Sequence, residues 1–253
     1  MFVSATECQN NFGRYLQLSE TENVIITRNG KRQAVLVHYP RGSDGYEAGE
    51  PIPEYGTSPR KEWWIGYEEF MAMTAKSENR YELIDGIVYL MASPGFTHQK
   101  VLGSMYITFV EYFKDHDSCD AFVAPFDIKL VRRKVRLSGE VTDKDINVVQ
   151  PDLLVLCDYA DEIDEEDRYQ GTPALAVEIL SPSSRSMDRI RKLDLYMDCG
   201  IGEFWLVDAA KRTIAVYSFA DNELESETLY AAGDTAESIR FPGLRVPVDT
   251  VMR

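Results

Sequence analysis

The sequence lacks the features of a membrane protein or of a structural zinc site. No apolar run reaches the roughly 20 residues of a membrane helix, and the first residues have neither the basic start nor the apolar centre of a signal peptide. Four scattered cysteines without C-x-x-C spacing and three histidines offer little for zinc. We therefore expect a cytoplasmic protein with no membrane partner, in which all four cysteines are reduced thiols.

The sequence also lacks an excess of basic residues. Its 27 Lys and Arg are opposed by 42 Asp and Glu, a formal net charge of −15, which argues against binding nucleic acid through a uniformly basic surface. Because net charge says nothing about distribution, a local basic groove stays open. Seven of the ten residues at 158–167 are acidic. That run predicts a solvated loop, with a partner-binding or DNA-mimicking element as the alternative.

Residues 1–40 have the pattern of a small separate unit. A short strand is followed by Ser4 or Thr6 as a helix cap. A hairpin comes next, and Asn29 and Gly30 can supply the positive φ angles of its turn. A βαββ unit of this size without a disulfide or metal usually needs docking or oligomerisation, so we expect a homodimer.

The segments VSATECQNNFGRYL and VIITRNGKRQAVLV resemble the N-terminal part of the Phd/YefM antitoxin family. In that family a small dimeric unit binds operator DNA, so the resemblance implies a DNA-binding or dimerisation module. The resemblance covers residues 2–39. The toxin-neutralising tail of those antitoxins is missing, because the chain continues into residues 41–60, a linker rich in Gly and Pro.

Residues 61–253 alternate between strand-like and helix-like patterns. This alternation predicts an α/β (α+β) fold, with a mixed central sheet flanked by helices. The expected elements are helices at 67–74, 97–116 and 183–199, a hairpin turning at Asp85-Gly86, strands around 121–130, 152–156 and 174–180, and two strands within 202–219. In the second helix we expect Thr97 to cap the start, and Val101, Met105, Ile107 and Phe109 to form the buried face.

One carboxylate interrupts an apolar strand. Residues 174–180 are an apolar run broken only by Glu178, and an ionised side chain in a dry interior is costly unless it is paired or coordinates an ion. Asp152 stands at the entry of another apolar strand, so the two carboxylates would meet if those strands were neighbours. Mg²⁺, or Mn²⁺, takes oxygen ligands of this kind, and a metal so held can activate water for phosphodiester hydrolysis.

Nuclease sites also use a lysine to position water and stabilise charge on the phosphate. Lys192 is a candidate, because Asp188, Lys192 and Tyr196 are spaced i, i+4, i+8 and share one face of the following helix. The alternative is an exposed lysine paired with Asp188.

Three segments, YELIDGIVYLMASPGFTHQ, PDLLVLC and LAVEILSPSSRSMDRIRKLDLYMDCGIGEFWLVD, together resemble the Uma-type restriction endonuclease family of the PD-(D/E)XK nuclease superfamily. The similarity spans nearly all of residues 60–220 in the right order. It implies a mixed sheet with a metal site at one edge of its central strands. Asp152 matches the PD aspartate and Glu178 the (D/E) position. Leu180 departs from the lysine expected there, and Lys192 matches the lysine that this branch carries on the following helix.

Further positions follow from the same resemblance. Glu82 matches an acidic residue that can join the metal site, with a solvated hairpin carboxylate as the alternative. His98 is a candidate for proton transfer or phosphate contact, with a capping or packing role as the alternative. Candidates for phosphate contacts near a helix N-terminus are Ser181, Ser184 and Arg185.

The sequence thus predicts a Mg²⁺-dependent endonuclease that acts on nucleic acid, with DNA favoured. Asp152, Glu178 and Glu82 would hold the metal, and Lys192 would orient the attacking water. The alternative is a non-catalytic DNA- or partner-binding regulator on an inactive nuclease scaffold. In a third interpretation, residues 1–45 restrain the nuclease.

Overall fold

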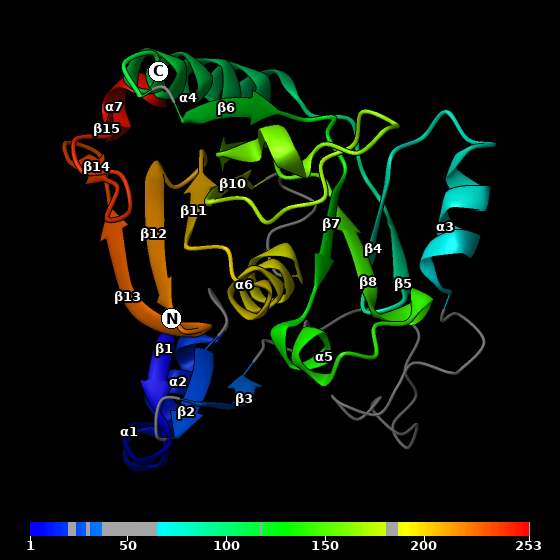
Figure 1. Cartoon of the computed structure of the whole chain (residues 1–253). Helices are drawn as coiled ribbons and strands as arrows, with labels where there is room; N and C mark the ends of the chain where they lie inside the picture. Colours follow the sequence, from blue (N-terminus) through cyan, green and yellow to red (C-terminus); the bar gives the residue numbers. More distant parts are fainter. Residues whose placement is uncertain (20–23, 29–30, 37–64, 117, 181–186, 253) are drawn as a thin grey trace. The chain divides into compact units, whose positions relative to one another are not determined.

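The computed structural model describes residues 1–19, 24–28, 31–36, 65–116, 118–180 and 187–252 (Figure 1). The chain divides into two compact units, Met1–Glu62 and Trp63–Arg253. Among the residues singled out above, Asn29, Gly30, Ser181, Ser184 and Arg185 lie outside the described residues. None of the described helices is long and apolar enough to cross a membrane.

The first unit is a three-stranded sheet with two short helices. Its elements are β1 (Phe2–Ser4), α1 (Ala5–Asn10), α2 (Phe12–Leu18), β2 (Val24–Arg28) and β3 (Lys31–Leu36). β1 pairs parallel with β2, and β2 pairs antiparallel with β3. The Glu7 amide donates to the Ser4 hydroxyl at 3.1 Å, so Ser4 is the helix cap. The βαββ order is as expected, with its helix divided into two.

The second unit is a mixed α/β structure built on two larger sheets and one small one. The six-stranded sheet has the order β13-β12-β11-β10-β9-β6, the four-stranded sheet β5-β4-β8-β7, and β14 pairs with β15. Within the six-stranded sheet β10 and β11 are parallel, and the other neighbouring strands are antiparallel. A mixed sheet flanked by helices, as the sequence predicted, is confirmed.

The strands and helices of this unit have the following bounds. The six-stranded sheet contains β6 (Cys119–Val123), β9 (Leu153–Cys157), β10 (Leu175–Ile179), β11 (Glu203–Asp208), β12 (Thr213–Ala220) and β13 (Glu223–Tyr230). The four-stranded sheet contains β4 (Tyr81–Ile84), β5 (Ile87–Leu90), β7 (Ile128–Val131) and β8 (Ile146–Val149). The remaining elements are α3 (Tyr67–Thr74), α4 (Phe96–Phe113), α5 (Arg133–Ser138), α6 (Met187–Cys199), α7 (Val248–Val251), β14 (Thr235–Glu237), β15 (Arg245–Pro247) and two short 3-10 turns, Asp143–Asp145 and Tyr159–Glu162.

The two faces of β10 pack against different parts of the protein. Leu175, Val177 and Ile179 belong to the main apolar core, together with Met105 and Phe109 of α4. Because side chains alternate along a strand, Glu178 points to the opposite face. Since β10 and β11 are parallel, the chain needs a crossover between them, and α6 is that crossover. Figure 1 shows α6 next to β11 and between the two larger sheets.

Several details of α4 and its neighbours differ from the prediction. α4 begins at Phe96 with Gly95 as its N-cap and no side-chain cap, so Thr97 does not cap it. Ile107 is 69% exposed, because it lies two residues and about 200° around the helix from Met105. The strand expected at 121–130 is two strands, β6 and β7, in different sheets. Pro125 stands between them, and a proline lacks the amide that a continuous central strand would need.

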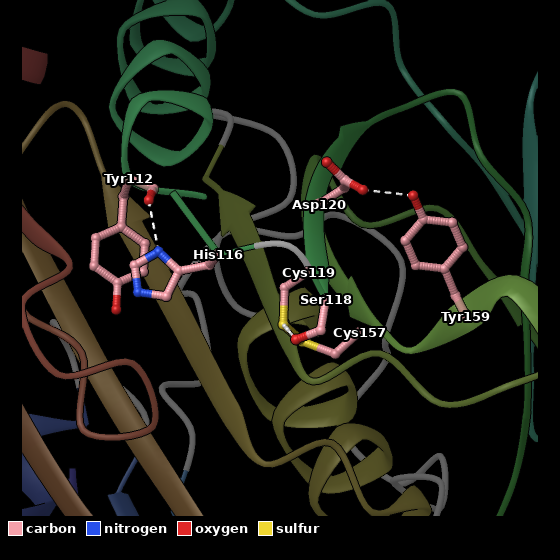
Figure 2. The surroundings of a disulfide bond; sticks show 7 residues. All are labelled: Tyr112, His116, Ser118, Cys119, Asp120, Cys157 and Tyr159. Atoms are coloured by element: carbon pink, nitrogen blue, oxygen red, sulfur yellow. Dashed lines mark hydrogen bonds between the residues drawn. A yellow bond between two sulfur atoms is a disulfide. The ribbon is translucent and has the colours of Figure 1, made fainter. Parts of the chain in front are cut away.

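Two cysteines form a disulfide, so the prediction of four reduced thiols is wrong for Cys119 and Cys157. Figure 2 shows this bond beside Ser118. Cys119 opens β6 and Cys157 closes β9, and the two residues are direct partners in the antiparallel register. They are separated by 38 residues in the chain, so no local spacing reveals the pair. Cys8 and Cys199 are free and buried, as expected.

Reduction of this disulfide is expected to destabilise the protein. A cross-link across a loop of this length restricts the unfolded chain and stabilises the fold by about 3–4 kcal/mol. Dithiothreitol should therefore lower the urea midpoint of the wild type. The double variant Cys119→Ala/Cys157→Ala should unfold at a lower urea concentration and no longer respond to the reductant. Identical wild-type curves with and without dithiothreitol would contradict the prediction.

Candidate active site

The candidate site lies where the chain passes from the four-stranded to the six-stranded sheet. Glu82 is on β4 of the first sheet, and Glu178 is on β10 of the second. Asp152 stands between β8 and β9, one in each sheet. Leu153 pairs with Val177 in the next strand, which makes Asp152 and Glu178 neighbours across β9 and β10. β9 and β10, which must be neighbours for Asp152 and Glu178 to meet, are neighbours.

Lys192 on α6 joins two of these carboxylates. Its ammonium is 2.8 Å from Glu82 Oε1 and 2.8 Å from Glu178 Oε1. The side chain is buried, with 3% of the residue exposed, so the alternative of an exposed helix lysine is wrong. Glu82 is 4% exposed, which also rules out a solvated hairpin carboxylate. One cation therefore compensates two buried glutamates at the junction of the sheets.

Tyr196 is a further partner of Glu178. Its hydroxyl donates to Glu178 Oε1 at 2.6 Å, and the residue is fully buried against Phe204. Lys192 and Tyr196 are four residues apart on α6, so they face the same carboxylate from one side of the helix. The sequence pattern placed Tyr196 on this face but gave no sign that it would contact Glu178.

Burial and the neighbouring charges set the protonation of the cluster. Burial opposes the charge of Lys192, but Glu178 and Glu82 outweigh it and raise the pKa of Lys192 above its usual range. Burial is also the largest influence on Glu178. Although Lys192 opposes the shift, burial together with Asp152 and Glu82 raises the pKa of Glu178 to about 8. Burial and Glu178 raise the pKa of Tyr196, which therefore remains a hydroxyl donor.

Asp152 is held by two donors at the edge of the site. The Ile179 amide donates to Asp152 Oδ2 at 2.8 Å, and His98 Nε2 lies 3.1 Å from the same oxygen. His98 therefore contacts the predicted aspartate instead of capping α4. Its Nδ1 is buried and has no hydrogen-bond partner among the described residues. An ionised carboxylate only accepts, so Nε2 is the donor to Asp152 and, in a neutral ring, Nδ1 is left as an acceptor.

Gln150 supports the site from the end of β8. Its backbone amide donates to Glu82 Oε1 at 2.8 Å, the oxygen that also contacts Lys192. Its side-chain oxygen accepts from Arg80 Nε at 2.7 Å, and its Nε2 donates to Asp127 Oδ1 at 2.7 Å. The sequence gave no signal for this residue, because its role depends on the pairing of β4 with β8.

Arg132 connects α6 to the four-stranded sheet. The guanidinium bonds both oxygens of Asp85, at 3.0 and 2.9 Å, in the hairpin turn between β4 and β5. It also donates to Asp194 at 3.0 Å and to Asp198 at 2.6 Å, both on α6. Burial opposes its charge, but the three carboxylates raise the pKa of Arg132. This bidentate contact holds the helix that carries Lys192 against the hairpin that carries Glu82.

The donor chemistry of the three carboxylates fits a hard divalent cation. Glu82, Glu178 and Asp152 each commit one oxygen to the donors named above, and their other oxygens accept no hydrogen bond from described side chains. Carboxylate oxygens are the ligands that Mg²⁺ takes, usually one or two with water and phosphate. Within the described residues no three His, Cys, Asp or Glu side chains form a preformed metal cluster. In this arrangement the Lys192 ammonium offsets one negative charge of the glutamate pair, and burial raises the pKa of Glu178 to about 8.

Comparison with known proteins gives one family and one fold. Residues 67–249 match the Uma2 family, described as "Putative restriction endonuclease". The uncharacterized protein slr1290 of Synechocystis sp. is 25% identical over 187 residues, which is 74% of this chain and 90% of that protein. A crystal structure of a "putative nuclease belonging to DUF820" from Anabaena variabilis superposes with a TM-score of 0.57 and 18% identity. It covers 74% of this chain and 97% of the other, and at that identity it supports the fold alone.

Glu178 makes the metal-free protein less stable as the pH rises. Its folded pKa of about 8 lies above the ordinary value of 4.5, so its stabilising contribution is complete below the ordinary value and is lost as the pH rises through about 8. Between pH 5 and 8 the wild type should lose up to about 1.4 kcal/mol per pH unit from this group.

Glu178→Gln removes this titration and should flatten the profile. Urea unfolding in EDTA at several pH values measures it, with Glu140→Gln, an exposed carboxylate, as the matched control. Equal slopes for the wild type and Glu178→Gln would contradict the prediction.

Proposed function

The chain belongs to the Uma2 family, and from this membership together with the buried carboxylate–lysine cluster we propose that it is a metal-dependent endonuclease. The observation that carries the proposal is the contact of Lys192 with both Glu82 and Glu178. A buried ion pair of this kind is weak support for stability alone. Groups with shifted pKa values gathered at one point are typical of a functional site.

We propose Mg²⁺, or Mn²⁺, as the cofactor and DNA as the preferred nucleic acid. Asp152 and Glu178 would hold the ion through the oxygens that accept no hydrogen bond from the described side chains, with Glu82 as a third ligand. When bound, the ion supplies Lewis-acid stabilisation of the scissile phosphate and lowers the pKa of water.

The residues of the chain divide the remaining work in this proposal. Lys192 fixes the two glutamates and places a positive charge where it can orient water and offset charge on the phosphate. Tyr196 and the Ile179 amide hold Glu178 and Asp152 in position. His98 has a buried nitrogen with no partner among the described residues, which suits it to accept or deliver a proton beside Asp152.

We further propose that the first unit is an antitoxin-like DNA-binding or dimerisation module and that the protein is a homodimer. Two apolar side chains on α2 support this part of the proposal. Phe12 is 50% exposed and Leu16 is 51% exposed, and their spacing of four residues places them on one face of the helix. The first unit has a small apolar core, and an exposed apolar pair on such a unit is suited to an interface between two copies of the chain.

Cleavage assays test the nuclease. Supercoiled, linear duplex and single-stranded DNA and RNA are incubated with Mg²⁺, Mn²⁺ or EDTA. We expect metal-dependent cleavage that falls at least about 100-fold in both Glu178→Ala and Lys192→Ala, because Glu178→Ala removes a ligand of the ion and Lys192→Ala removes the positive charge that offsets the phosphate. The exposed residues Glu140 and Lys100 provide matched alanine controls.

The variants also separate chemistry from folding. Lys192→Ala leaves two buried glutamates uncompensated and is itself destabilising, so its thermal unfolding is measured in parallel, and Glu178→Gln preserves the shape of the site. Cleavage that persists in Glu178→Ala would overturn the proposed site. No cleavage under any condition would favour the non-catalytic regulator.

The dimer is tested by molar mass. The chain has a mass of 28.8 kDa, and light scattering of the wild type should give twice that value. Phe12→Glu combined with Leu16→Glu should give the monomer mass, because two charges are placed in an apolar interface. Gln9→Glu, at an exposed position of α1, is the control. A monomeric wild type, or an unchanged mass in the double variant, would contradict the prediction.

A further inference from the structure

A cavity of about 210 Å³ lies on the α3 face of the four-stranded sheet. Val148 lines it and pairs with Leu83, whose side chain points away from that of the adjacent Glu82. The cavity and the carboxylate–lysine cluster therefore lie on opposite faces of this sheet. α3 contributes Tyr67, the connection between β6 and β7 contributes Phe126 and Asp127, β7 contributes Lys129, and Tyr169 closes another side. An apolar cavity of about 150 Å³ holds a benzene molecule. This cavity therefore has room for one heteroaromatic ring system.

Gln150 connects the cavity to the carboxylate–lysine cluster. Its backbone amide bonds Glu82 at 2.8 Å, and its side chain bonds Asp127 in the cavity wall at 2.7 Å. Gln150 is buried, so the contact is fixed within the protein. Gln150 follows the last residue of β8, so a nucleic-acid strand that reaches both the cavity and the cluster passes around this end of the four-stranded sheet.

The cavity combines aromatic faces with hydrogen-bonding groups. The half-buried ring of Phe126 lies 5.7 Å from that of Phe122, which supports it as a firm stacking surface. Asp127 is exposed, and its second oxygen accepts no hydrogen bond from the described residues. Lys129 lies 4.8 Å from the centroid of the Tyr67 ring and 3.3 Å from Gln170 Oε1. Asp167 and Arg168 also line the cavity, so its wall carries charges of both signs, and its aromatic faces favour a planar ligand.

We propose that this cavity binds one nucleobase of the substrate strand. Phe126 stacks on the base, Asp127 accepts a hydrogen bond from an exocyclic amino group, and Lys129 contacts the adjoining carbonyl or phosphate oxygen. The carboxylate therefore selects cytosine, adenine or guanine over thymine or uracil, which carry no amino group. Only an unstacked base offers its face to a protein ring, so the preferred substrate is single-stranded or has an extruded base. The role of the cavity in cleavage rests on the proposed nuclease function, but the binding of the base does not.

Binding is measured without cleavage, on the full-length protein in EDTA. The probes are fluorescent single-stranded oligomers of equal length and charge, namely oligo-dC, oligo-dT and an abasic sugar–phosphate strand, followed by anisotropy. We expect the wild type to bind oligo-dC about tenfold more tightly than the abasic strand, because stacking of a base on an aromatic ring contributes at this level. Oligo-dT should lie between them. Equal affinity for oligo-dC and the abasic strand would overturn the proposal without any variant.

Two variants locate the contacts. Phe126→Ala should weaken oligo-dC binding about tenfold and leave the abasic strand unchanged. Asp127→Asn should remove the preference for oligo-dC over oligo-dT, because an amide can donate to the thymine O4. Leu229→Ala, at a side chain that is 65% exposed on β13, and Asp115→Asn, at an exposed position, are the matched controls. If Phe126→Ala behaves as Leu229→Ala does, the stacking role fails.

The same samples, assayed with Mg²⁺, separate this inference from the nuclease proposal. Base-dependent binding without cleavage supports the cavity and counts against the nuclease. Cleavage without any discrimination between oligo-dC, oligo-dT and the abasic strand in binding supports the nuclease and overturns the cavity.

Discussion

The contact of Lys192 with Glu82 and Glu178 is the interaction on which the rest of the candidate site depends. It joins a helix to strands of two different sheets, and it places three ionisable groups where water has little access. A buried charge without a partner would be strongly destabilising, so each member requires the others. The second oxygens of Glu82 and Glu178 accept no hydrogen bond from the described side chains.

Two polar networks outside the cluster hold its parts in register. Arg132 fixes α6 against the turn between β4 and β5 through Asp85, Asp194 and Asp198. Gln150 fixes Glu82 from the adjacent strand and extends to Asp127. Because a site needs its groups held within a fraction of an ångström, these residues matter as much as the carboxylates. Gln150 also links Glu82 to Asp127 in the wall of the cavity on the other face of the four-stranded sheet.

The sequence predicted those features that depend on local pattern. The apolar run around Glu178, the i, i+4 relation of Lys192 to Tyr196 and the turn at Asp85-Gly86 are all properties of short segments. The errors arose where local pattern is ambiguous. Ile107 is apolar but lies on the outer face of α4, and the apolar residues around Pro125 belong to two strands. Cys119 and Cys157 carry no motif, since only the pairing of β6 with β9 brings them together.

The sequence by itself determined the fold class and the family to which the chain belongs. It also indicated Asp152, Glu178, Lys192 and Glu82 as candidate site residues. Only the tertiary structure decided that Lys192 contacts both glutamates, that Gln150 and Arg132 support them, and that a disulfide joins β6 to β9. The physical reason is the range of the interactions. Periodicity and turns depend on residues a few positions apart, whereas the hydrogen bond between β4 and α6 joins residues 110 positions apart. Those between β10 and α6 join residues 14 and 18 positions apart, still beyond any local pattern.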